Sequence, residues 1–172
     1  MEIRQLSENM KNIMDHTLSL ARVCYQCSTC AGACPVFRNN PEMNPRVIIQ
    51  KLILGQVEEV LASSNFWYCS YCLLCTQRCP QGVDLAHLLV DLKNLSVRRG
   101  ITPVGVLDEM KTLYLTGLTQ ETSKTIINRR KKLNLPEMQY PDLTEIQKIM
   151  DVSGFNDLLK LNTRKQKTSE PL

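Results

Sequence analysis

The chain has 172 residues, with 21 Lys and Arg against 17 Asp and Glu, and its formal net charge is +4. A hydrophobic fraction of 43% is too high for an intrinsically disordered protein, and no apolar run approaches the ~20 residues that a membrane-spanning helix needs. Residues 1–5 have mixed charge, and no apolar signal-peptide core follows them. We therefore expect a cytoplasmic protein with no transmembrane segment of its own. The small net charge does not indicate nucleic-acid binding.

The N-terminal half is predicted to be helical on both sides of its cysteines. Apolar residues recur at helical spacing from Ile3 to Met14, which predicts a helix leading into the first cysteines. Asn44 and Pro45 suit the N-cap and first turn of a second helix, and Gly55 suits its end. A short helix is expected over residues 57–61.

The C-terminal half carries three further helix signals. Asp84 can cap a helix whose apolar stripe runs over residues 85–95, with Gly100 after it. Pro103 opens another helix, which ends before Gly117. A capping-box pattern, Asp142 followed by Glu145, precedes the apolar residues 146–150. No stretch alternates convincingly enough to predict a strand, so the expected fold class is all-α.

The eight cysteines form two runs of the pattern C-x2-C-x2-C-x3-C-P. The first run is Cys24, Cys27, Cys30 and Cys34, followed by Pro35; the second is Cys69, Cys72, Cys75 and Cys79, followed by Pro80. The runs repeat each other in register and leave no cysteine over. Without a secretory signal the thiols should stay reduced, which disfavours a disulfide framework.

The spacing predicts two [4Fe–4S] clusters. A cubane takes four thiolates, and three can come from one tight turn; in two-cluster proteins the fourth cysteine of each run ligates the other cluster. The predicted ligands of cluster 1 are Cys24, Cys27, Cys30 and Cys79, and those of cluster 2 are Cys69, Cys72, Cys75 and Cys34. Structural zinc is the weaker alternative, because one tetrahedral ion usually takes two separated cysteine pairs.

Other side chains near the cysteines have ordinary interpretations. Six of the nine aromatic residues lie between residues 25 and 71; core packing is favoured over a dedicated shield against water, although packed rings would shield as well. His16 and His87 are isolated in the sequence, and neither is expected to be a ligand. No catalytic residue set is recognised.

The expected organisation has three parts. A two-cluster helical ferredoxin module spans residues 1–100, a helical extension for partner docking spans residues 101–162, and residues 163–172 form a disordered tail. A long segment with helical patterning separates the cysteine runs, unlike the close spacing of compact βα ferredoxins. The basic run at residues 129–132 is interpreted as a solvated face or a protein-docking patch rather than a nucleic-acid site.

Several segments resemble HdrC, the small iron–sulfur subunit of heterodisulfide reductases. They are residues 68–84 around the second cysteine run, Asn44-Pro45-Arg46 with the helix after it, and residues 94–100, 130–136 and 149–155. The resemblance covers roughly residues 20–160. The first run differs slightly, since Ser28 stands where many relatives have glycine.

The resemblance implies an electron-transfer role within an oxidoreductase complex. A chain of this kind would take electrons from an HdrA-like flavin and iron–sulfur subunit and pass them to an HdrB-like catalytic subunit. The HdrB-like subunit would reduce the coenzyme M–coenzyme B heterodisulfide, as in methanogenesis, or a related disulfide. The chain itself would be non-catalytic. Two alternatives stay open: the iron–sulfur subunit of another dehydrogenase or a stand-alone carrier, and a metal-stabilised interaction module.

Overall fold

The structure is a computed structural model that describes residue 15 and residues 18–19, 21–120 and 122–169. Over these residues it is helical and contains no strand, which confirms the predicted all-α class. The helix expected between Ile3 and Met14 lies outside the described residues. The chain divides into two compact units, residues 1–101 and residues 102–172, one residue after the boundary that the sequence suggests. Among the described residues, no helix combines the length and apolarity needed to cross a bilayer.

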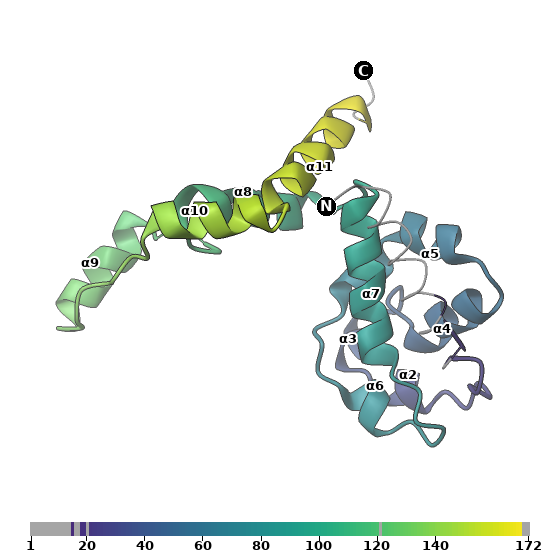
Figure 1. Cartoon of the computed structure of the whole chain (residues 1–172). Coiled ribbons are helices and arrows are strands. Elements are labelled where there is room, and N and C mark those ends of the chain that lie inside the picture. Colours follow the sequence, from purple (N-terminus) through teal and green to yellow (C-terminus); the bar gives the residue numbers. More distant parts are fainter. Residues whose placement is uncertain (1–14, 16–17, 20, 121, 170–172) are drawn as a thin grey trace. The chain divides into compact units, whose positions relative to one another are not determined.

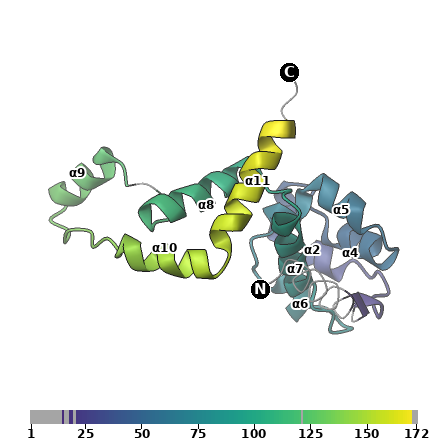
Figure 2. The same ribbon diagram turned by 45° about the horizontal axis from the view of Figure 1, so that its top comes forward.

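The first unit packs several short helices against one long one (Figures 1 and 2). Its elements are α2 (Thr29–Ala33), α3 (Pro35–Asn39), α4 (Pro45–Ile53), α5 (Val57–Ser63), the 3-10 helix η1 (Asn65–Tyr68), α6 (Leu74–Gln77) and α7 (Leu85–Arg98). Helix α2 contacts α6 and α4, while α7 contacts α6 and η1. The two cysteine runs are thereby brought side by side, because α2 follows the start of the first run and α6 lies within the second.

One face of α7 supplies much of the core of this unit. Leu85, Leu88, Leu89 and Leu92 follow helical spacing and are all buried. They belong to one apolar cluster with residues of α4, α5 and η1, including the fully buried Phe66. The cluster also contains the buried thiols of Cys34 and Cys75, so the cysteine sites are continuous with the hydrophobic core.

The predicted caps of this unit are confirmed. The Asn44 side chain accepts hydrogen bonds from the backbone N–H groups of Arg46 (3.1 Å) and Val47 (3.3 Å) at the start of α4. The Asp84 carboxylate accepts from the His87 N–H at the start of α7 (3.3 Å). Gly55 adopts φ +78° just after α4, the left-handed conformation that ends helices.

Removal of the Asn44 cap is expected to destabilise the first unit measurably. Asn44→Ala leaves two N–H groups of α4 without their side-chain acceptor and should lower the free energy of unfolding by about 1 kcal/mol. Anaerobic thermal unfolding followed by circular dichroism measures this loss. Asn44→Asp keeps an acceptor at the same place and should unfold like the unmodified chain; equal destabilisation by both variants would contradict the capping role.

The second unit consists of α8 (Val104–Thr116), α9 (Lys124–Lys132), α10 (Leu143–Val152) and α11 (Phe155–Ser169). Helices α8, α10 and α11 contact one another in all three pairs. Their buried residues include Leu107, Leu159 and Asn162. Gly117 ends α8 at φ +71°, where a Cβ atom would lie 2.7 Å from Pro141, so only glycine fits this turn.

The polar residues from Thr163 onward are expected to be disordered, but α11 continues to Ser169. The reason lies in contacts that are distant in sequence. Buried Asn162 accepts a hydrogen bond from the Thr102 hydroxyl (2.5 Å), and the Gln166 side chain donates to the Thr102 carbonyl (3.1 Å). These bonds hold a polar helical turn that composition alone suggests is disordered.

Candidate metal centres

The eight cysteines are all free thiols, and the most exposed one has the same place in both runs. The second cysteine of each run, Cys27 or Cys72, is exposed. Cys34 and Cys75 are buried, and the remaining thiols are half-buried. Each run therefore presents one thiol at the protein surface and others toward the core.

The same unusual backbone geometry occurs at matching positions of the two runs. Gln26 and Ser28 in the first run have φ values of +63° and +68°, and their counterparts Tyr71 and Leu73 have +54° and +63°. This left-handed conformation is disfavoured for residues with a Cβ atom, by about 1–2 kcal/mol each. It bends the chain just before and just after the second cysteine of each run. At Ser28, a glycine would adopt the same bend without this cost.

The fourth cysteine of each run is held by a backbone N–H group. Cys34 precedes Pro35, the first residue of α3, and its sulfur accepts from the Phe37 N–H at 3.4 Å. The sulfur of Cys79 accepts from the Val83 N–H at 3.3 Å. N–H groups aimed at sulfur stabilise a thiolate, which is the form that binds iron.

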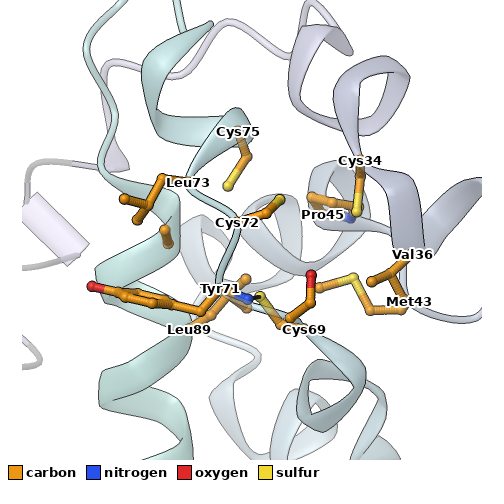
Figure 3. Close-up of a pocket in the computed structure, with 12 residues that line it drawn as sticks. Cys34, Val36, Met43, Pro45, Cys69, Tyr71, Cys72, Leu73, Cys75 and Leu89 are labelled. Carbon is orange, nitrogen blue, oxygen red and sulfur yellow. Dashed lines mark hydrogen bonds between the residues drawn. The ribbon is translucent and has the colours of Figure 1, made fainter.

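The second run and Cys34 line one cavity. Its thiols are those of Cys34, Cys69, Cys72 and Cys75. Figure 3 shows Cys34 facing the other three thiols across the cavity. The walls between them are mostly apolar and include Met43 and Leu89.

The first run and Cys79 line another cavity. Its thiols are those of Cys24, Cys27, Cys30, Cys79 and, in addition, Cys75. Arg46 also lines this cavity. Each cavity thus brings together three cysteines of one run with the fourth of the other, and Cys75 borders both cavities.

The donor set of each cavity fits a cubane cluster. Within the described part of the chain, no three Cys, His, Asp or Glu side chains gather tightly enough to hold a single metal ion. Each proposed set of four thiols lines one cavity. A [4Fe–4S] cluster needs that arrangement, with one thiolate at each iron corner.

Burial or hydrogen bonding shifts the pKa of three of the thiols. Burial is the largest influence on Cys30 and raises the pKa of its thiol to about 11. Burial likewise raises the pKa of Cys75. A hydrogen bond to Thr29, 3.2 Å away, lowers the pKa of the exposed Cys27. Iron binding at the buried positions must therefore displace protons, so site assembly should be favoured by higher pH.

The aromatic residues near the runs have more than one environment. Phe66 is fully buried and belongs to the core, in line with ordinary packing. Tyr25, Tyr68 and Tyr71 are exposed, so they do not form a closed shield. Lys93, which no sequence motif singles out, donates to the Cys69 carbonyl (3.0 Å) and lies 5.7 Å from the centre of the Trp67 ring.

Of the two histidines, the structure describes His87, and His16 lies outside the described residues. His87 lines neither cavity, and it is not isolated: its ring is within hydrogen-bond distance of Asp84 (2.5 Å) and of the Tyr71 hydroxyl (2.7 Å). Asp84 lies three residues before His87 and is predicted from the sequence only as a helix cap, whereas Tyr71 is 16 residues away, so spacing alone gives no signal of that contact.

Known proteins resemble the chain both locally and over most of its length. The 4Fe-4S dicluster domain matches residues 20–83, which include all eight cysteines. The HdrC iron–sulfur subunit of CoB–CoM heterodisulfide reductase from Methanopyrus kandleri is 31% identical, over 91% of this chain and 85% of that protein. The corresponding iron–sulfur subunit from Methanocaldococcus jannaschii is 26% identical, over 99% of this chain and 100% of that protein.

A third relative is the HdrC subunit of the H2:CoB–CoM heterodisulfide,ferredoxin reductase of Methanothermobacter marburgensis, 28% identical over 92% of this chain and 87% of that protein. The dicluster match and the two four-thiol cavities agree that the chain carries two [4Fe–4S] clusters. Together with the similarity over most of the chain, they show that the chain belongs to the HdrC family of heterodisulfide reductase iron–sulfur subunits.

Proposed function

We propose that this chain is the electron-transfer subunit of a cytoplasmic heterodisulfide reductase complex. It relays electrons from an HdrA-like flavin and iron–sulfur subunit to an HdrB-like catalytic subunit, which reduces the coenzyme M–coenzyme B heterodisulfide of methanogenesis or a related disulfide. The names of the relatives support the substrate class, since those proteins are subunits of CoB–CoM heterodisulfide reductases. The partner subunits follow from the family resemblance.

The observation that carries the proposal is the pair of adjoining cysteine-lined cavities. Each bound [4Fe–4S] cluster takes up and releases one electron at a time. Cys75 borders both cavities, so the two sites are direct neighbours within one core. Cys27 and Cys72 are exposed, which gives each site an edge at the surface for exchange with a partner.

The proposed ligands are four cysteines per site, with the fourth exchanged between runs. The first site uses Cys24, Cys27, Cys30 and Cys79, and the second uses Cys69, Cys72, Cys75 and Cys34. The chain has 8 cysteines in all, so this assignment leaves no thiol for substrate chemistry. The role proposed for the chain is therefore electron transfer without catalysis.

We assign docking to the second unit. Leu115 on α8 and Ile149 and Val152 on α10 are exposed large apolar side chains, and Val152 is 92% exposed. The charged end of α9, residues 129–132, adds a basic surface. Exposed apolar side chains beside charged ones are typical of protein-interaction surfaces.

Metal analysis tests the cofactor content on which the proposal depends. The chain purified without oxygen should contain about eight irons and about eight acid-labile sulfides, because two cubanes each hold four of both. The measurements are iron and sulfide assays on protein of known concentration, with zinc determined in parallel. One or two zinc ions in place of iron would contradict the proposal.

A further inference from the structure

A hydrogen-bonded chain of three side chains borders the cavity of the second cysteine run. The Asp84 Oδ2 atom lies 2.5 Å from His87 Nδ1, and His87 Nε2 lies 2.7 Å from the Tyr71 hydroxyl oxygen. The two rings meet edge to face, with centres 5.6 Å apart and an angle of 85° between their planes. Tyr71 is one of the residues that line the cavity, whereas His87 and Asp84 are not.

Asp84 fixes the orientation of the His87 ring. Its Oδ1 atom accepts from the Thr76 hydroxyl (2.9 Å) and from the His87 backbone N–H (3.3 Å), so the carboxylate is held on both sides. Burial raises the pKa of Asp84, but these hydrogen bonds and the bond to the His87 ring outweigh it and lower the pKa overall. An ionised carboxylate at Nδ1 keeps a proton on that nitrogen and leaves Nε2 directed at Tyr71.

Tyr71 occupies a backbone conformation that needs support. It lies between Cys69 and Cys72 with φ +54°, which is disfavoured for a residue with a large side chain. In this conformation its backbone N–H points at the sulfur of Cys69, 3.4 Å away. The bond from its hydroxyl to His87 anchors the far end of the side chain to α7.

The first run reaches the same backbone conformation with a different anchor. Gln26, the counterpart of Tyr71, has φ +63°, and its own side-chain amide donates to the sulfur of Cys24 at 3.5 Å. Gln26 is thus held by the Cys24 thiol, whereas Tyr71 is held by His87 on α7. The two sites of this internal repeat therefore differ in how their loops are fixed.

We propose that His87, oriented by Asp84, is a positioning residue that holds Tyr71 so that its N–H group stays on Cys69 and raises the reduction potential of the second cluster. The inference rests on the proposed ligand assignment. Reduction adds one electron to a cluster, from a 2+ to a 1+ core, and no proton is required. An N–H group donated to a ligating sulfur stabilises the added negative charge, so its loss makes reduction harder.

The test is a potentiometric titration of the full chain with both clusters bound, followed by paramagnetic resonance. Tyr71→Phe removes only the hydroxyl, and His87→Leu removes the ring that holds it. Each variant should shift the midpoint potential of the second cluster to a lower value and leave that of the first unchanged. The double variant should shift it no further, because both changes break the same chain of bonds.

Matched controls separate positioning from direct electrostatic effects. Gln26→Leu removes the anchor of the first run and should shift only the first cluster. Tyr71→Gly allows the left-handed conformation at this position without a side chain that His87 could hold. Adding His87→Leu to this variant should therefore cause no further shift in the midpoint potential of the second cluster. A shift in that background would mean that His87 acts on the cluster directly and would overturn the positioning role.

Two further outcomes are equally decisive. If both clusters are bound and neither Tyr71→Phe nor His87→Leu moves the second potential, the inference is wrong while the proposed function stands. If the unmodified chain lacks the two clusters, the proposed function fails and the inference fails with it. Iron analysis of every sample distinguishes the two results.

Discussion

Replacement of Cys79 by serine should disturb the cluster of the first cysteine run, although Cys79 belongs to the second. Cys79 lines the cavity of Cys24, Cys27 and Cys30, and the cavity of Cys69, Cys72 and Cys75 is completed by Cys34 instead. Serine keeps the size of the side chain but supplies no thiolate, so one iron corner loses its ligand. The reduced Cys79→Ser variant should therefore lose or alter the same paramagnetic signal as Cys27→Ser.

The reciprocal variant provides the control. Cys34→Ser should alter the other signal, the one that Cys72→Ser affects, because Cys34 faces the second run across its cavity. Both variants carry the same chemical change at the same position of their runs. If Cys79→Ser instead matched Cys72→Ser, and Cys34→Ser matched Cys27→Ser, each run would ligate its own cluster and the exchange of ligands would be wrong.

The features that the sequence predicts correctly depend on residues that lie close together in the chain. The caps Asn44 and Asp84 act on N–H groups two or three residues away, and the structure confirms both. The helical class follows from the same short-range periodicity. The cysteine pattern predicts the cofactor because the proposed assignment takes three ligands of each cubane from seven consecutive residues. These features need no knowledge of tertiary contacts.

The features that the sequence did not reveal depend on contacts between distant residues. His87 looks isolated along the chain, yet it meets Tyr71 of the second cysteine run once α7 packs beside α6. The last turns of α11 look like a polar tail, yet Gln166 donates to Thr102. The left-handed residues, such as Tyr71 and Leu73, carry no local signal either, because glycine is what that conformation normally selects.

The isolated chain should accept electrons but should not reduce a heterodisulfide. Disulfide cleavage needs two electrons and a site that holds the sulfur fragments. The proposed assignment uses all eight cysteines as cluster ligands, leaving no free thiol and no open iron corner. With a strong reductant the chain should therefore take up one electron per cluster, seen as bleaching of its visible absorbance. It should show no turnover with the coenzyme M–coenzyme B disulfide.

Addition of the partner subunits should restore that turnover, and each cluster should be required for it. In a complex of this chain with its HdrA-like and HdrB-like partners, Cys27→Ser or Cys72→Ser interrupts the relay at one site and should reduce heterodisulfide-dependent oxidation of the donor to background. Binding of the disulfide to the HdrB-like partner should be unchanged, because the variants lie in a different chain. A matched surface variant, Tyr68→Phe, removes an exposed hydroxyl outside the proposed ligand set and should retain full turnover. Steady disulfide reduction by this chain alone would contradict the relay, because the chain would then carry out the chemistry itself. Undiminished turnover after loss of either cluster would also contradict it, because the electrons would then take another path.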